Sequence, residues 1–531
     1  MILRHPPLAL FFLTLAALVP GIWEATGITG KDEFYLGLRT PMEMMAGDHW
    51  LVPFLDGAPR IKKPPLLYWL GRASYETLGV SLFSARLVAV CFAALLVAAT
   101  AGIARRLSGE ARTGWLAGLV LLGCLGLHSE GRRFMLDVPV AALSATALWC
   151  TLIWLEKPRW PWLTAATLAL AAGFLVKGPI VALVCGAGLA ALALGGNLSR
   201  RDLAGRWPAL AAHGALFLAL ALPWFGLVRL LYPQAAELAL ADEVESRQFF
   251  HLSPEIALGL VNVAAPWVFV FCAGAWAQRR QPLARLLLAW FLLSFVPFFF
   301  LRSFDRYLIG SLVPLAILVA VALPELRLGW PFRLGLAVAL LAGGLLAGFA
   351  AWFGLGGWYW LPLPAAYLAW AWWRPGRPGH CLAAPIVFWS ALLAGVFPAL
   401  GINAVPTAVV DLGKTRPVAF FDGPQPALLP ILAQAPHRHY TRLDRRAATE
   451  LAGSQALVFC ESKDSPRLAE QAAAAGWRAV PAGRYATLAS HGSGVRFARL
   501  GATAADWREA LVRRDLGPLL TTVEWFTLEA P

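Results

Sequence analysis

The chain has 531 residues, of which 59% are hydrophobic and only 14% are charged. Soluble domains carry about a quarter of their residues as charged side chains, so this composition excludes an ordinary water-soluble fold and favours a membrane protein. The net charge of +14 suits cytoplasmic loops that face anionic lipid, and it therefore predicts membrane lipid as a partner and no nucleic acid.

Apolar runs of about the 20 residues that cross a bilayer recur along the first part of the chain. The first run, 8–23, follows Arg4 and has no small-residue cleavage site after it, so we interpret it as an uncleaved helix. Lys and Arg are denser in the loops on the side of Arg4, which places the N-terminus inside and, for an odd number of spans, the C-terminus outside. The pattern predicts about thirteen membrane spans, the clearest at 82–104, 208–231, 284–301 and 331–353.

Two outer loops are long enough to hold structure of their own. The loop 24–81 contains two amphipathic stretches, about 33–46 and 64–78, which predict helices that lie along the membrane surface. A turn-rich stretch separates them. The loop 233–255 is acidic, and its composition predicts an ordered segment.

The hydropathy falls near position 400, and this fall predicts a division into two domains. Residues 1–403 form a polytopic α-helical membrane domain, and residues 404–531 form a small extracytoplasmic α/β domain. Short apolar strands at 418–422 and 455–461 and a helical pattern at 465–476 support the second assignment.

Acidic residues at the outer rim of the membrane are candidates for chemistry, because burying an unpaired charge is costly unless the charge is used. Each of them could instead be an ordinary solvated loop acid. Arg132 and Arg133 could simply neutralise Asp137, which begins a predicted span. The candidates are Asp32 with Glu33, Asp137, Asp242 with Glu243 and Glu245, and Asp305.

Basic residues on the same side could hold a phosphate group. Lys63 precedes two prolines, which give it a stiff, extended backbone suited to positioning a charge. Arg247 and Arg306 are further candidates. Interfacial anchors whose charged ends reach the lipid headgroups are the favoured interpretation of Lys62, Arg72 and Lys177.

The order of motifs along the chain resembles a known family. The pair Asp32–Glu33 outside the first span is followed by GDHWLVPFLDGAPRIKKPPLLYW (47–69) and by Arg86, which opens the next span. This order resembles the aminoarabinose transferases and the dolichyl-phosphate-mannose protein mannosyltransferases, which are GT-C glycosyltransferases. The resemblance covers about residues 1–400. Further similar segments are RRFMLDVPVAAL (132–143), FLVKGPI (174–180), PWVFVF (266–271) and SFDRYLIGSLVPLAIL (303–318).

The resemblance implies a glycosyltransferase of the bacterial inner membrane that needs no cofactor. Such an enzyme takes a sugar from a polyprenyl-phosphate donor and passes it, with inversion, to an extracytoplasmic lipid A-like lipid, glycan or protein. It implies that Asp32 accepts a proton from the acceptor or orients it. The implied catalytic carboxylates are Asp32, Glu33 and Asp137. The implied contacts of the donor phosphate and sugar are Lys63, Arg247, Arg306 and Tyr307.

One departure from this family concerns a metal. Aminoarabinose transferases often carry Glu before the Lys-Pro-Pro motif and His in the second outer loop, where this chain has Lys62 and Val244. No Cys/His cluster in the sequence has the spacing of a metal site either, so we expect no bound metal. His251 could be a substitute ligand, but a lone His before a span is more often a capping or interfacial residue.

Two other classes of function remain open from the sequence. A flippase for lipid-linked sugars, or another transporter, would explain the many spans and predicts ionisable residues near the middle of the membrane. A non-catalytic envelope assembly protein would explain the C-terminal domain. An outward cavity that contains Asp32, Lys63, Asp137 and Arg247 would favour the transferase over both.

Overall fold

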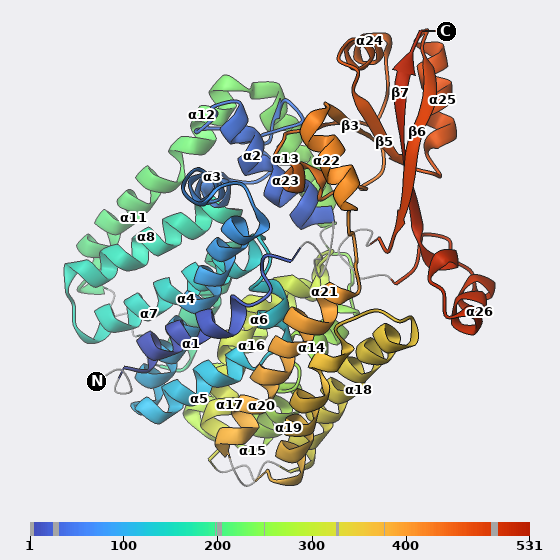
Figure 1. Ribbon diagram of the computed structural model, residues 1–531. Helices are drawn as coiled ribbons and strands as arrows, with labels where there is room; N and C mark the ends of the chain where they lie inside the picture. Colours follow the sequence, from blue (N-terminus) through green and yellow to red (C-terminus); the bar gives the residue numbers. More distant parts are fainter. Residues whose placement is uncertain are drawn as a thin grey trace.

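The computed structural model describes residues 5–530 apart from 25–30, 197, 199–203, 249, 325–328, 376–377 and 490–496; for Lys31, Arg247 and Pro378 it describes the backbone alone. Figure 1 shows a large helical body, with a twisted sheet from the end of the chain standing beside its upper right-hand side. The body is built from the first 400 residues, as the hydropathy predicts.

Within the part of the chain that the structure describes, eight helical segments are long and apolar enough to cross a membrane. The four clearest predicted spans coincide with members of this set and are confirmed. The segments are α4 (Leu82–Ser108), α7 (Asp137–Glu156), α8 (Trp160–Lys177), α11 with α12 (Trp207–Ala221, Pro223–Leu231), α16 with η3 (Pro282–Phe295, Val296–Phe300), η4 with α17 (Asp305–Ser311, Leu312–Ala322), α18 (Trp330–Trp352), and α20 with η6 and α21 (Pro378–Ala391, Leu392–Val396, Phe397–Ala399).

Several further helices are shorter or bent. Helices α14 (Ile256–Ala264) and α15 (Val268–Ala277) meet at an angle of 98° around Pro266, which lacks the N–H that a continuous helix would use. The number of membrane crossings, about thirteen from the sequence, stays a prediction. The shorter helices are α1 (Pro6–Leu18), α5 (Ala111–Leu122), α6 (Leu125–Glu130), α9 (Ile180–Leu194), η5 (Trp358–Trp360) and α19 (Pro362–Trp373).

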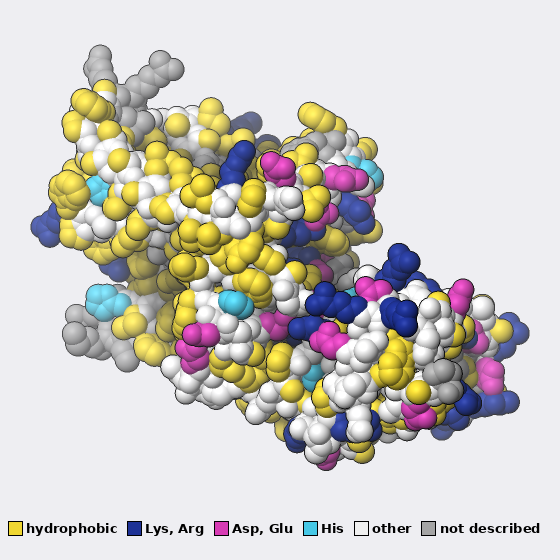
Figure 2. Space-filling model, turned by 90° about the horizontal axis from the view of Figure 1, so that it is seen from above, with side chains coloured by type: hydrophobic (Ala, Val, Ile, Leu, Met, Phe, Trp, Pro, Cys, Tyr) yellow, Lys and Arg dark blue, Asp and Glu magenta, His cyan; other side chains and the backbone are white. Residues whose placement is uncertain are grey.

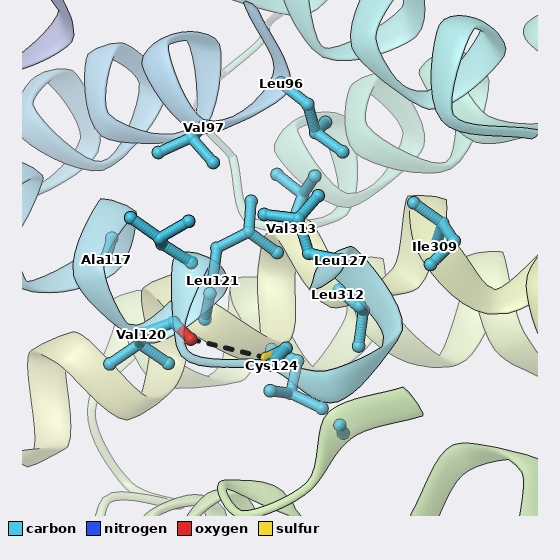
Figure 3. Packing of buried hydrophobic residues seen from close by; sticks show 14 of the residues in the cluster. Leu96, Val97, Ala117, Val120, Leu121, Cys124, Leu127, Ile309, Leu312 and Val313 are labelled. Carbon is cyan, nitrogen blue, oxygen red and sulfur yellow. Dashed lines mark hydrogen bonds between the residues drawn. The ribbon is translucent and has the colours of Figure 1, made fainter. Parts of the chain in front are cut away.

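Helices α4, α5 and α17 meet in the core of the body, where small and branched apolar side chains interlock (Figure 3). Leu96 of α4, Leu121 of α5 and Leu312 at the start of α17 are fully buried there. The Cys124 thiol donates a hydrogen bond of 3.3 Å to the Val120 carbonyl oxygen within this packing. In lipid, the exclusion of water cannot drive helices together, so close packing of this kind holds them in contact.

The first outer loop folds as its amphipathic stretches predict. A π-helical segment η2 (Lys31–Leu38) continues into α2 (Arg39–Ala46), and α3 (Leu66–Leu78) begins directly after Pro64 and Pro65. A short hairpin, β1 (Phe54–Leu55) with β2 (Ala58–Pro59), occupies the turn-rich stretch between them. The second outer loop forms α13 (Pro233–Arg247), which confirms that it is ordered.

The end of the chain forms a five-stranded mixed sheet in the order β4-β3-β5-β7-β6. The strands are β3 (Val418–Phe421), β4 (Arg438–Tyr440), β5 (Leu457–Glu461), β6 (Arg478–Thr487) and β7 (Thr521–Glu529). Strand β3 runs parallel to β4 and β5, whereas β7 is antiparallel to β5 and β6. The predicted α/β pattern is therefore confirmed, while the domain boundary at 404 stays a prediction.

Helices cover both faces of this sheet. Ala419 and Phe421 of β3 pack against α24 (Arg445–Gly453) and α25 (Ser465–Ala474), and the alternate residues Val418 and Phe420 pack against α22 (Thr407–Thr415) and α23 (Leu429–Ala433). This alternation follows from the two-residue period of a strand. Helix α26 (Ala504–Arg513) and η7 (Gly517–Leu519) lie between β6 and β7 in the chain.

The sheet domain also packs against the first outer loop. Leu428 and Ile431 share a buried cluster with Phe34 of η2 and Met42 of α2, and Figure 1 shows α23 beside α2. Seen from above, most charged side chains gather over the right half of this face, whereas hydrophobic side chains cover much of its upper left (Figure 2).

Candidate active site

A cavity of about 460 Å³ lies where the two outer loops meet the ends of three membrane segments. Its lining is strongly charged, although the residues come from distant parts of the sequence. The structure brings together most of the residues that the sequence singled out. They are Asp32 on η2, Lys63 before α3, Asp137 at the start of α7, Lys177 at the end of α8, Glu243 on α13, and Arg306 and Tyr307 on η4.

Arg306 connects the two carboxylates at the centre of the cavity. Its Nη2 lies 2.8 Å from Oδ2 of Asp32, and its Nε lies 3.3 Å from Oδ2 of Asp137. The Asp137 side chain is 5% exposed, so these ionic contacts replace water around its charge. Asp137 is also the first residue of α7, where the free backbone N–H groups of a helix favour a negative charge.

Lys177 is part of this cluster, which corrects its interpretation as an anchor reaching the headgroups. The side chain is buried, its ammonium donates to Oδ1 of Asp137, and its Nζ lies 3.9 Å from the centre of the Tyr307 ring. Helices α7 and α8 are consecutive, so the start of the first lies beside the end of the second. That arrangement is a signal in the sequence that could have paired Lys177 with Asp137.

The arginines that follow α6 do not contact Asp137. Arg133 donates two hydrogen bonds to the Glu130 carboxylate, at 2.8 and 2.9 Å, and Arg132 donates to the Ala17 carbonyl oxygen at 2.9 Å. Neither arginine therefore forms an ion pair with Asp137 among the described residues, although the positive charge of Arg133 still acts favourably on that carboxylate.

Two adjacent ion pairs join the outer loops at the rim of the cavity. Nζ of Lys63 lies 2.5 Å from Oε2 of Glu243, and Lys62 pairs with Asp242. The prolines that follow Lys63 favour an extended backbone, so the neighbouring lysines reach neighbouring acids on α13. Lys62 is thus an ion-pair partner at the rim, not the interfacial anchor that the sequence favoured.

Glu33 lies outside the cavity although its neighbour Asp32 lines it. Its fully buried carboxylate accepts hydrogen bonds from Arg86 at 2.9 and 3.2 Å and from the backbone N–H of Phe134 at 2.9 Å. These bonds tie η2 to α4 and to the segment that leads into Asp137. The structure therefore gives the two carboxylates of the acidic pair different surroundings.

Arg72 is also buried, which corrects its interpretation as an anchor. It donates to Asp48 and Glu76, each at 2.7 Å, and to the Met44 carbonyl oxygen at 3.0 Å. It therefore holds α3 against the end of α2. The prediction for Arg247 concerns a side chain that lies outside the described residues.

A second buried cluster connects the first outer loop to the sheet. Arg39 contacts the carboxylates of Glu43 and Asp56 at 2.9 and 2.6 Å and donates to the His437 carbonyl oxygen. Asp56 also accepts from the backbone N–H of His439 at 2.9 Å. Burial raises the pKa of Glu43 to about 7, helped by the nearby Asp56 and opposed by Arg39.

Two largely apolar spaces adjoin the charged cavity. One, of about 350 Å³, shares Asp137, Lys177 and Tyr307 with it and continues between apolar side chains of α7, α9 and η3. The other, of about 850 Å³, shares Phe304 and Arg306 with the charged cavity. It is lined mainly by apolar residues of α18, α20 and η6. Space suited to hydrocarbon chains therefore adjoins the charged cavity.

The expectation of a metal-free site stays a prediction. In the described part of the chain, no group of three or more His, Cys, Asp or Glu side chains is close enough to hold a metal ion. His251, considered as a substitute ligand, is exposed in the segment after α13. The carboxylates that line the cavity instead face cations of the protein itself.

Comparison with known proteins gives three kinds of match. Residues 62–225 match a family model described as dolichyl-phosphate-mannose-protein mannosyltransferase. The undecaprenyl phosphate-alpha-4-amino-4-deoxy-L-arabinose arabinosyl transferase of Pseudomonas aeruginosa is 30% identical over 326 residues, which cover 57% of this chain and 56% of that protein. A Sodalis glossinidius protein of the same description is 27% identical over 333 residues, 59% of this chain and 57% of that protein. The chain thus spans somewhat over half the length of the curated relatives it matches.

The fold matches a solved membrane protein over nearly its whole length. The crystal structure of ArnT from Cupriavidus metallidurans bound to undecaprenyl phosphate has a TM-score of 0.72, at 19% identity, and covers 97% of both chains. The same protein in the apo state gives a TM-score of 0.71 at 20% identity, over 87% of this chain and 94% of that chain. The membrane architecture and the C-terminal sheet therefore belong to one established fold.

Proposed function

Because this chain belongs to the GT-C glycosyltransferase family of the aminoarabinose transferases and dolichyl-phosphate-mannose protein mannosyltransferases, we propose that it transfers a sugar from a polyprenyl-phosphate donor. The acceptor is a lipid A-like lipid, a glycan or a protein outside the cytoplasm. One observation carries the proposal: a cavity lined by paired carboxylates and cations adjoins a largely apolar groove with which it shares lining residues.

The donor fits this combination of polar and apolar space. The part of its polyprenyl chain next to the phosphate occupies the groove of about 350 Å³, and its phosphate lies among Lys63, Lys177 and Arg306. Cations that are shielded from water attract a phosphate more strongly than cations in bulk solvent do. Tyr307 lines both spaces and contacts the phosphate or the sugar. Arg247 stays a predicted phosphate contact.

The chemistry assigned to the cavity is an inverting displacement at the anomeric carbon. The bond between this carbon and the phosphate oxygen breaks, and its electron pair stays on the phosphate. The acceptor oxygen forms the new bond and gives its proton to Asp32, whose side chain is 29% exposed and faces the cavity. Asp137 positions Arg306 and Lys177, which offset the charge that develops on the leaving phosphate.

The acceptor approaches through the second space. This space of about 850 Å³ is lined by Arg306 and Phe304, which also line the charged cavity. Two approaches that meet at one arginine suit attack from the face opposite the leaving group. Glu33 supports this geometry by holding η2 and the segment before Asp137, in place of the catalytic role that the resemblance implies.

The chain is a multi-pass membrane protein, and we place its cavity on the extracytoplasmic side of the bacterial inner membrane. The charge pattern of the loops supports this orientation. Ionisable side chains gather where the outer loops meet the helix ends. A transporter would need them along a path through the middle of the membrane, so the structure favours a transferase over a flippase.

The test compares a deletion strain with the same strain expressing the native chain. Mass spectrometry of polyprenyl-phosphate sugars and of envelope glycans, lipids and proteins is expected to show an accumulated donor and one missing decoration. Expression of Asp32→Asn should leave both changes in place. A deletion strain with unchanged donor pools and a complete envelope would contradict the proposal.

A further inference from the structure

Helix α18 marks the depth of the membrane surface. It has 23 residues, from Trp330 to Trp352. At 1.5 Å per residue it is about 35 Å long, enough to cross the apolar layer of a bilayer. Only 28% of its apolar stretch is buried within the protein, so most of the helix faces lipid. Both terminal tryptophans are exposed, as is typical of aromatic side chains at the two surfaces of a membrane. Trp352 therefore lies at one of these surfaces.

Helix α26 of the sheet domain is fixed against this end of α18. Nε1 of Trp352 donates a hydrogen bond of 3.0 Å to the Leu511 carbonyl oxygen, and the guanidinium carbon of Arg514 lies 4.4 Å from the centre of the Trp352 ring. Ala510 is fully buried in a cluster with Phe353, the residue after α18. Figure 1 shows α26 below the sheet, level with the upper end of α18 and at the outer edge of the molecule. The helix therefore lies at the depth of the membrane surface.

The exposed surface of α26 combines apolar and basic side chains. Val512 is 78% exposed and Leu511 is 44% exposed, and Leu500, a few residues before the helix, is 47% exposed. Arg508 is also exposed and forms no ion pair with a carboxylate among the described residues. Helices that lie in the headgroup layer have this composition, because their apolar side chains enter the lipid while their basic side chains meet headgroup phosphates.

The charge of this region is nearly balanced. Its acids mostly have partners within the protein, since Glu509 lies 2.6 Å from Arg513 and Asp506 lies 3.1 Å from Arg499. Apolar contact is therefore the main attraction to lipid, and headgroup charge is a minor one. The charged residues are the four arginines 499, 508, 513 and 514 and the three acids 506, 509 and 515.

We propose that α26 lies in the headgroup layer of the membrane and anchors the sheet domain to the lipid beside α18. Leu511 and Val512 enter the lipid, while Arg508 and Arg514 stay at the level of the headgroup phosphates. A domain held at a fixed height keeps the contacts that its helix α23 makes with η2 and α2. This contact with lipid does not depend on the reaction assigned to the cavity.

The test places a fluorophore on α26 and measures its depth in the bilayer. The exposed cysteines are first removed by Cys91→Ser and Cys272→Ser, and the other five are buried. Val512→Cys is labelled with the fluorophore NBD in the full chain, in nanodiscs of phosphatidylcholine. The control is the same label on Glu470→Cys, an exposed position of α25, which Figure 1 shows near the upper end of the sheet. A nitroxide on the lipid headgroup should quench the label at 512 roughly threefold or more as strongly as the label at 470.

Two further measurements exclude insertion driven by the label itself. Trp352→Ala removes the contact that sets the depth of α26 and should reduce the quenching at 512, whereas Trp373→Ala, at an exposed tryptophan of α19, should not. Iodide in the water should quench the label at 470 and leave the label at 512 largely unaffected. Equal quenching of the two positions by the lipid nitroxide, or free access of iodide to position 512, would show that α26 faces water and would overturn the proposal.

Discussion

Lys177 offers the sharpest test of how the charged cluster is held together. Replacing it with Met keeps the length of the side chain but removes the ammonium that contacts Asp137. The two side chains are 8% and 5% exposed, so Asp137 would lose one of its two cationic partners in a site that water hardly reaches. Removing one partner of a buried ion pair costs about 3 to 5 kcal/mol. Arg306 remains 3.3 Å away, so we expect a loss near the lower end of that range.

The measurement is the free energy of unfolding of the purified protein in mixed micelles, followed by tryptophan fluorescence. Lys157→Met is the matched control, because Lys157 is exposed just after α7 and a surface change of this kind shifts stability by less than about 0.5 kcal/mol. The double variant Lys177→Met with Asp137→Asn should lose less than the sum of the two single changes, because the pair is coupled. Equal stability of Lys177→Met and Lys157→Met would refute the buried pair and restore the anchor interpretation.

Four further predictions follow from the site. Asp32→Asn should slow transfer about 10²- to 10⁴-fold, as expected for a lost general base, while a thermal-shift assay stays near the native value because the side chain is 29% exposed. Normal turnover would remove Asp32 from catalysis. Lys63→Ala should weaken donor binding about 10- to 100-fold, measured as the displacement of radiolabelled undecaprenyl phosphate from the full chain in nanodiscs by a polyprenyl-phosphate sugar. The control is Lys414→Ala, which changes an exposed lysine with its own acidic partner and should leave donor binding unchanged. Equal effects of the two substitutions on donor binding would contradict the contact between Lys63 and the phosphate. In the folded chain the pKa of Glu43 is raised from 4.5 to about 7. Between these two pH values the folded chain therefore keeps a proton that the unfolded chain loses. The free energy of unfolding should consequently fall by about 3 kcal/mol as the pH rises from 4.5 through 7. Glu43→Gln should reduce the dependence of the melting temperature on pH in this range. An unchanged dependence would contradict the raised pKa of Glu43. Transfer activity should survive exhaustive chelation of metal ions, because the ammonium of Lys62 pairs with the Asp242 carboxylate at the rim. Loss of activity on chelation, with recovery when one particular metal ion is added, would show that the reaction needs a metal.

The features that the sequence predicts best are those that depend on local pattern. Helices α4 and α18 follow from the length of their apolar runs, and α3 follows from its amphipathic stretch after two prolines. Strands β3 and β5 follow from short apolar runs between turns. Each of these elements is specified by neighbours within a few turns of chain, so no long-range contact is needed to identify it.

The pairing of charges could not be predicted in the same way. Asp32 and Glu33 are adjacent in sequence, yet consecutive residues of a helical segment point in different directions. Which of them faces the cavity depends on Arg86 and Phe134, which lie 53 and 101 residues beyond Glu33. The partner of Lys177, Asp137, lies at the far end of the preceding helix, so only the consecutive order of α7 and α8 indicates this pair in the sequence. A charge at a helix end is an anchor or a partner depending on what packs beside it.

The sheet at the end of the chain bears on the active site through the segment that carries Asp32. This segment, η2, is π-helical, and such turns are rare and frequently found at functional sites. Phe34 of η2 packs against Leu428, the residue immediately before α23. Arg39, the first residue of α2, is fully buried and contacts the His437 carbonyl oxygen beside β4. Each contact fixes the segment on the side away from the membrane helices, while Glu33 and Arg86 fix it on the other. The position of Asp32 against Arg306 is thus set from both sides, and the sheet belongs to the geometry of the cavity although it contributes no side chain to its lining.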